Sequence, residues 1–199
     1  MTLTSMRRAP ARWPAWPGWY LLAALALLAS LAAEQAWAQD TQAEYRIKAA
    51  FVCKFGNYIE WPPAAFASPE APFSIGVWAP AAVADEVAAA AGGLLVHGRP
   101  ISVRRVGPGD SLEGLHILFV ARGPAARLAA ALAAVKDRPI LTVTESDMPA
   151  EAGAVVNFVI VDDKVKFDVS LAAAERSSLK VSARLLGVAR QVAGGRPSS

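Results

Sequence analysis

Two hydrophobic patterns follow one another along the chain. Continuous apolar runs at residues 73–78 (FSIGVW) and 116–121 (HILFVA) are typical of strands that are buried on both faces of a sheet. Alanine-rich stretches at residues 81–91 and 124–135 have the length of helices, and the second begins with a proline, which the first helical turn tolerates. Strands that alternate with helices of this length predict right-handed crossovers and a largely parallel sheet.

The pattern changes in the last third of the chain. Residues 164–169 alternate charged and apolar side chains, which is the period of a strand with one solvated face. Asp162 and Asp163 separate this segment from another apolar strand, as in a hairpin turn. Residues 171–175 and 181–192 are predicted to be helical. We therefore expect a single three-layer α/β domain, with a mixed, mostly parallel sheet of about six strands, a C-terminal antiparallel hairpin and helices on both faces.

The first predicted helix, residues 42–60, carries a lysine on its apolar face. At about 100° per residue, Lys48 lies angularly between Phe55 and Ile59, inside the apolar arc. The other polar side chains share a separate, solvated stripe: Arg46, Lys54, Asn57 and Glu60. Lys48 therefore extends its amine past the edge of the core, pairs with an acid, or faces a ligand or partner. The segment Trp61-Pro62-Pro63 is predicted to end the helix.

The chain begins with the three parts of a secretory signal. Three arginines within the first twelve residues precede an uncharged apolar run at residues 20–33, which is too short to span a bilayer comfortably. Ala36-Trp37-Ala38 then places small residues at the two positions that a signal peptidase reads. We predict that residues 1–38 are a signal peptide, cleaved between Ala38 and Gln39, and that the mature protein works outside the cytoplasm. An uncleaved N-terminal anchor is the alternative.

Removal of the signal changes the charge balance. It takes three Arg and one Glu from the 20 basic and 17 acidic residues, so the net charge falls from +3 to +1. Nucleic acid is therefore not an expected partner. Residues 39–193 are long enough for one domain with a packed core, and we expect residues 194–199 to form a disordered tail. Cys53 is the only cysteine, which excludes an internal disulfide, and its helical position favours a buried thiol over an intermolecular one.

No motif points to catalysis. The two histidines, His97 and His116, lack the spacing of metal ligands, and the chain has neither a Gly-x-Ser-x-Gly elbow nor a phosphate-binding loop. We expect no catalytic residue, no metal and no cofactor. Glu145, Asp147 and Glu151 follow a strand, at the edge of a parallel sheet where ligands bind, but a solvated acidic loop is the expected interpretation.

Several segments together resemble one family. Residues 45–51 (YRIKAAF), followed by Phe55 and by residues 58–62 (YIEWP), resemble the N-terminal signature of the YfiR family. Three later segments resemble its glycine-to-Asn-Phe strand, its strand-into-helix segment and its closing helix: residues 153–158 (GAVVNF), 164–174 (KVKFDVSLAAA) and 179–186 (LKVSARLL). The segments occur in the right order and span nearly the whole mature chain.

The resemblance implies a small periplasmic α/β protein, often dimeric, that is not an enzyme. Members of the YfiR family repress a membrane-bound diguanylate cyclase through its periplasmic region, and so restrain cyclic-di-GMP synthesis and biofilm output. The implied partner is an inner-membrane diguanylate cyclase or another membrane sensor, and a homodimer is compatible with the sequence. Some relatives use disulfides, a form of control that Cys53 alone cannot provide within one chain.

Two functions of different classes stay open. One is a periplasmic signalling regulator, and the other is a periplasmic small-ligand binding protein. The candidate residues for contact with a partner or ligand come from the segments that carry the resemblance: Lys48, Glu60 and Trp61 from the first, and Asn157 and Phe158 from the second. Each also has a structural interpretation, and Asn157 in particular can hydrogen-bond a neighbouring loop.

Overall fold

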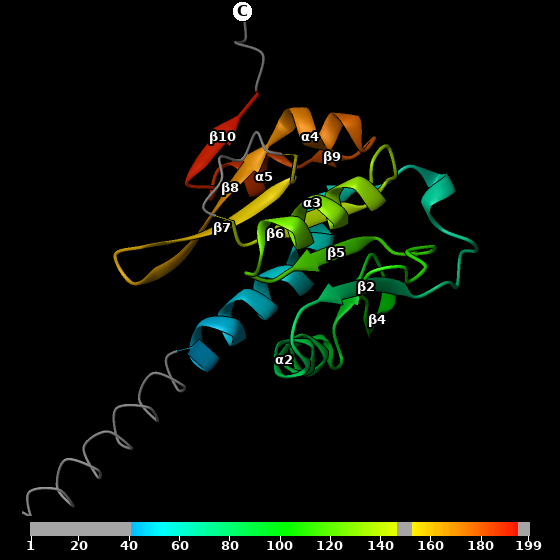
Figure 1. Ribbon diagram of the computed structural model, residues 1–199. Helices are drawn as coiled ribbons and strands as arrows, with labels where there is room; N and C mark the ends of the chain where they lie inside the picture. Colours follow the sequence, from blue (N-terminus) through cyan, green and yellow to red (C-terminus); the bar gives the residue numbers. More distant parts are fainter. Residues whose placement is uncertain (1–40, 147–152, 195–199) are drawn as a thin grey trace, which may run out of the picture. The chain divides into compact units, whose positions relative to one another are not determined.

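A computed structural model describes residues 41–146 and 153–194 (Figure 1). The predicted signal peptide, its cleavage site, and Asp147 and Glu151 of the acidic segment lie outside these residues. The chain divides into two compact units, Met1–Thr41 and Gln42–Ser199, and apart from Thr41, the first helical residue, the elements below belong to the second. Within the described ranges, no helix combines the length and the apolar character that crossing a membrane requires.

A central sheet of eight strands has the order β10-β8-β7-β6-β5-β2-β4-β3. Its strands are β2 (Phe73–Trp78), β3 (Leu95–Val96), β4 (Arg99–Arg105), β5 (Ile117–Val120), β6 (Leu141–Thr144), β7 (Val156–Val161), β8 (Lys164–Ser170) and β10 (Gln191–Ala193). The five neighbouring strands β4, β2, β5, β6 and β7 pair in parallel, whereas β7 and β8 form an antiparallel hairpin. The mixed, mostly parallel sheet is confirmed, and the short outer strands β3 and β10 extend it beyond the six strands expected.

Helices cover both faces of this sheet. They are α2 (Ala81–Ala91), α3 (Ala125–Ala134), α4 (Leu171–Arg176), α5 (Ala183–Leu186) and a first helix over residues 41–55, called here the Lys48 helix. Along β5, Ile117 and Phe119 join a larger core that includes the Lys48 helix and α2. The intervening Leu118 and Val120 join a smaller core that includes α3. Because alternate residues of one strand enter different cores, the three-layer prediction is confirmed.

The Lys48 helix ends earlier than predicted. After residue 55, the turn η1 (Gly56–Tyr58) leads into β1 (Ile59–Glu60), which pairs antiparallel with β9 (Lys180–Val181). A further turn, η2 (Pro63–Ala65), follows. The prediction of helix to residue 60 is wrong because β1 finds its hydrogen-bonding partner in a distant part of the sequence. Apolar spacing within the segment contains no information about that partner.

The helix predicted at residues 181–192 is also wrong. Val181 belongs to β9, α5 has only four residues, and β10 pairs in parallel with β8. Ser182 caps α5, since its hydroxyl accepts a hydrogen bond from the Leu185 N–H. The Arg190 guanidinium then donates two hydrogen bonds to the carboxylate of Asp168 in β8, one of them over 2.7 Å. The pairing of β9 with β1 and of β10 with β8, together with the Arg190–Asp168 contact, determines the structure of residues 180–193. Local periodicity does not.

Candidate functional site: a buried carboxylate at the sheet edge

The lysine on the apolar face of the first helix is buried against an acid from the sheet. Lys48 is 1% exposed, and its Nζ lies 3.3 Å from Oε2 of Glu145. The Glu145 side chain is itself 1% exposed. The same Nζ also bonds Glu44, which lies one turn earlier on the Lys48 helix. Of the alternatives considered for Lys48, the structure therefore shows pairing with an acid.

Glu145 occupies the carboxyl end of the parallel sheet. Val120 of β5 and Thr144 of β6 are register partners, so Arg122 and Glu145 lie close together just beyond their strands. The Arg122 N–H donates to Glu145 Oε2 over 3.3 Å, and the Tyr45 hydroxyl donates to the same oxygen over 3.2 Å. The prediction that Glu145 belongs to a solvated acidic loop is wrong, because donors from two other elements surround its carboxylate.

In this cluster two carboxylates face the Lys48 ammonium group, and the charge of Arg122 also acts on Tyr45. Burial, together with the charge of Glu145, raises the pKa of the Tyr45 hydroxyl, which therefore stays protonated and remains a donor. The second carboxylate oxygen of Glu145, Oε1, is buried and has no hydrogen-bond partner among the described residues. A buried charged acceptor without a partner is energetically unfavourable.

Asn157 holds the backbone on either side of Glu145. Its Oδ1 accepts hydrogen bonds from the Thr144 hydroxyl and the Ser146 N–H, both over 2.9 Å. Its Nδ2 donates to the Ser146 carbonyl over 2.8 Å. The interpretation of Asn157 as a residue that hydrogen-bonds a neighbouring loop thus describes its geometry.

The five candidate residues separate into two groups. Phe158 lies in the larger core with its ring centroid 6.0 Å from Lys48 Nζ, so it joins Lys48 and the asparagine around the buried carboxylate. Trp61 packs edge-on against Phe73, the first residue of β2, with 5.1 Å between ring centroids. Glu60 is exposed in β1. Glu60 and Trp61 therefore belong to the amino end of the parallel strands, away from Glu145.

A cavity of about 190 Å³ adjoins Glu145. Its walls run from the end of β5 through the first turn of α3 and return to the residues after β6: Val120, Ala121, Arg122, Gly123, Pro124, Ala125, Arg127, Leu128, Glu145 and Ser146. Ligands of open parallel α/β sheets bind beyond the carboxyl ends of the strands, which is where this cavity lies.

Two arginines, Arg122 and Arg127, are among the residues that line this cavity. Pro124 precedes α3, so no side chain caps this end of the helix, and its first turn contains no acid. The guanidinium of Arg127 lies over Gly123, where an added Cβ would stand 2.8 Å from Arg127 Nη1. Arg122 contributes a second cation to the lining. Sequence reasoning did not single out either arginine, although the strand-proline-helix order marked the position of the helix start.

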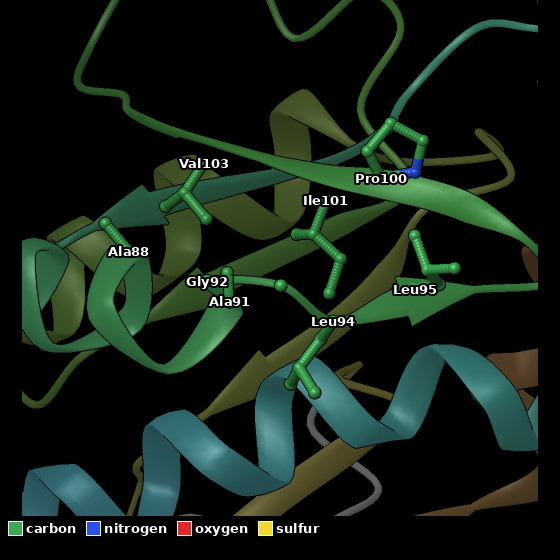
Figure 2. A pocket seen from close by; sticks show the side chains of 9 residues that line it. Ala88, Ala91, Gly92, Leu94, Leu95, Pro100, Ile101 and Val103 are labelled. Atoms are coloured by element: carbon green, nitrogen blue, oxygen red, sulfur yellow. The ribbon is translucent and has the colours of Figure 1, made fainter.

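A second cavity, of about 260 Å³, lies between the end of α2 and β4 (Figure 2). Nine residues line it: Ala88, Ala91, Gly92, Gly93, Leu94, Leu95, Pro100, Ile101 and Val103. The side chains drawn in Figure 2 are all apolar. None of these side chains donates or accepts a hydrogen bond, so the polar surface of this cavity comes from the backbone.

His116 occupies the other end of the parallel strands. Its ring stacks on Phe66 and Phe73, with centroid separations of 4.4 Å and 4.8 Å, and its Nδ1 accepts the Ser74 N–H over 3.0 Å. Burial lowers the pKa of His116, which favours the neutral ring. In residues 41–146 and 153–194, no group of three or more His, Cys, Asp or Glu side chains is placed to hold a metal ion.

No curated protein matches the chain. A solved structure, described as the ABC domain in complex with L-Trp from Streptococcus pneumonia, is 10% identical with a TM-score of 0.49. The similarity covers 72% of this chain and 60% of that one, so this chain spans less than two thirds of its length. A family model described as YfiR/HmsC-like matches residues 45–190. The chain therefore belongs to the YfiR/HmsC-like family.

Proposed function

We propose that this protein is a periplasmic signalling regulator that represses a membrane-bound diguanylate cyclase, and so limits cyclic-di-GMP and biofilm output. The observation that carries the proposal is the family match over residues 45–190. It covers most of the Lys48 helix and every strand of the central sheet except β10, which is nearly all of the described domain. The predicted signal peptide supports a location outside the cytoplasm.

The regulator acts by binding and not by catalysis, and it needs no cofactor. Its partner is an inner-membrane cyclase or another membrane sensor, and it works as a monomer or a homodimer. Among the five candidate contact residues, Glu60 is exposed and suits direct contact with a protein partner. Lys48, Asn157 and Phe158 are buried, so their contribution to binding is to position other groups.

Deletion of the gene tests this function directly. Cyclic-di-GMP and biofilm mass should rise in the deletion strain, and the wild-type gene supplied in trans should restore both. Affinity purification of the mature chain from solubilised membranes should recover the cyclase. Unchanged nucleotide levels in a strain that expresses the cyclase would overturn the proposal.

A charge reversal at Glu60 tests the contact surface. Glu60→Arg should weaken repression with little change in stability, because an exposed side chain contributes little to the folded state. Glu70→Arg is the matched control, since Glu70 is also exposed but lies outside β1. Equal repression by both variants would remove Glu60 from the partner surface.

A further inference from the structure

We propose that β4 binds an extended, acidic segment of a partner protein as an additional strand of the central sheet. The segment lies along residues 101–105, called here the free edge. Its apolar side chains enter the cavity between α2 and β4, and one of its carboxylates pairs with Arg105. The binding can be measured with peptides on the isolated protein, so its failure would leave the proposed repression of a cyclase untouched.

The first argument is the backbone of β4. β3 pairs only with the first two residues of β4, so the free edge has a neighbouring strand on one side only, within the described part of the chain. The Val106 N–H donates to the Val77 carbonyl of β2 over 3.0 Å. Because successive residues of a strand direct their backbone groups to opposite sides, Val103 and Arg105 direct theirs away from β2. An unpaired row of this kind is a template for a further strand.

The second argument is the cavity beside the free edge. Ile101 and Val103 line it from β4, and the end of α2 forms the facing wall (Figure 2). Because side chains alternate along a strand, every second side chain of an added strand would lie on this face of the sheet. The cavity of about 260 Å³ is smaller than the pockets of roughly 300–1,000 Å³ that enclose a whole small ligand. It therefore suits the apolar side chains of a peptide.

The third argument is charge. β4 contains three arginines and no acid: Arg99, Arg104 and Arg105. Among the described residues, none of the three forms an ion pair. Arg105 is exposed, and by the alternation of the strand it continues the row of Ile101 and Val103. A segment with apolar side chains at alternate positions and a carboxylate at the next position of the same face is complementary to this row.

Fluorescence anisotropy of a labelled peptide, titrated with the mature chain, provides the test. In the probe peptide, leucine alternates with threonine, and a glutamate stands at each end of the leucine row. Saturable binding is expected, and a peptide with lysine in place of glutamate should bind at least tenfold more weakly. Absence of binding, or equal affinity for the two peptides, overturns the proposal.

Two N-methylated isomers of the probe separate strand addition from docking by side chains alone. Each isomer lacks the N–H donors of every second residue, so one has lost the donors that face β4 and the other those that face solvent. One isomer should therefore bind at least tenfold more weakly than the other. Equal affinities would show that the main chain makes no pairing and would overturn the proposal.

A first pair of substitutions locates the apolar contact. Ala88→Phe fills the cavity from α2 and should weaken peptide binding at least tenfold. Ala89→Phe is the control, because Ala89 is exposed on the same helix and does not line the cavity. Equal affinity of the two variants overturns the proposal. A wild-type dimer that Ala88→Phe dissociates would assign the free edge to a second copy of the chain and would also overturn it.

A second pair locates the ionic contact and does not depend on the first. Arg105→Glu should reverse the preference, so that the lysine peptide binds more tightly than the glutamate peptide. Arg184→Glu is the control, since this exposed arginine belongs to α5. Both side chains are exposed, so both variants should fold, which circular dichroism checks. An unchanged preference in Arg105→Glu contradicts the proposed pairing.

Discussion

At the scale of single residues, Lys48 and Glu145 depend on each other. Each side chain is almost fully excluded from solvent, so the charge of either one is tolerable only beside the other. Glu44 and Tyr45 add hydrogen bonds at the rim of the pair, and the Arg122 N–H fixes it to the sheet. The resulting network joins the Lys48 helix to the carboxyl ends of β5 and β6.

Removal of the lysine should therefore be costly. Lys48→Met leaves the Glu145 carboxylate buried without its cation, and we expect a loss of about 3–5 kcal/mol in unfolding free energy. Urea denaturation followed by circular dichroism measures it. Lys54→Met is the control, because Lys54 is exposed on the same helix, and its cost should stay within about 0.5 kcal/mol. A double variant, Lys48→Met with Glu145→Gln, should recover part of the loss; if it does not, the two residues do not act as a pair.

His116 should make stability depend on pH. Burial lowers its pKa below the ordinary value of 6.5, so the unfolded chain takes up a proton at a higher pH than the folded one. This contribution is fully present above pH 6.5 and is lost as the pH falls toward the lowered pKa. Thermal unfolding between about pH 7.5 and about pH 5 should show a smaller decline in His116→Gln than in the wild type. The exposed His97, replaced by Gln, is the control, and an unaltered decline in His116→Gln would contradict the assignment.

The apolar spacing of the Lys48 helix predicted where the lysine points, but it could not identify the partner. Glu145 is 100 residues from Tyr45, and in the sequence it appears beside two further acids, as a surface loop would. Its burial results from the register of β5 against β6, which brings the Arg122 N–H to its carboxylate. Side-chain periodicity indicates which residues share the buried face of a helix or strand. It does not indicate which distant residues they contact, because that depends on how the elements assemble.

At the scale of elements, the short β1–β9 pair decides where the first helix stops. Prediction from sequence succeeded where a strand forms a continuous apolar run that is almost entirely buried, as for β2 and β5. It failed at residues 59–60 and 180–181. These two-residue strands are strands only because they pair with each other. Such short segments contain too few positions for either period to be distinguished.

Gly56, the first residue after the Lys48 helix, packs closely against its neighbours. A Cβ there would stand 2.8 Å from both γ-carbons of Val96 and 3.1 Å from the Phe73 ring. Neither neighbour can move cheaply, so Gly56→Ala should lower the unfolding free energy by about 1–3 kcal/mol. Gly107→Ala is the control, because its nearest neighbouring atom is 3.8 Å away. Equal chemical denaturation midpoints for both variants would show that the region near Val96 can adjust.

At the scale of the whole molecule, packing and buried ion pairs such as Lys48–Glu145 stabilise the described domain, without a disulfide. Cys53 is the only cysteine, its side chain is buried, and burial raises its pKa to about 11. The thiol should therefore react slowly in the folded state.

Redox conditions should consequently have little effect on the mature chain. The melting temperature should be the same with and without dithiothreitol, and a thiol reagent should label Cys53 only as fast as the protein unfolds. Denatured protein, labelled in parallel, gives the reference rate. A shift of several degrees on reduction, or a dimer that reductant dissociates, would contradict the expectation.

The edge strands of the central sheet also limit how two copies of this protein can form a dimer. β3 covers only Arg99 and Pro100 of β4, and β10 covers only the last three residues of β8. The parts left uncovered carry cations, Arg104 and Arg105 on one side and Lys164 and Lys166 on the other. Two copies that joined their sheets edge to edge would bring like charges together, which is a recognised protection against uncontrolled polymerisation. A homodimer of this protein should therefore form through side-chain surfaces, with the two sheets remaining separate.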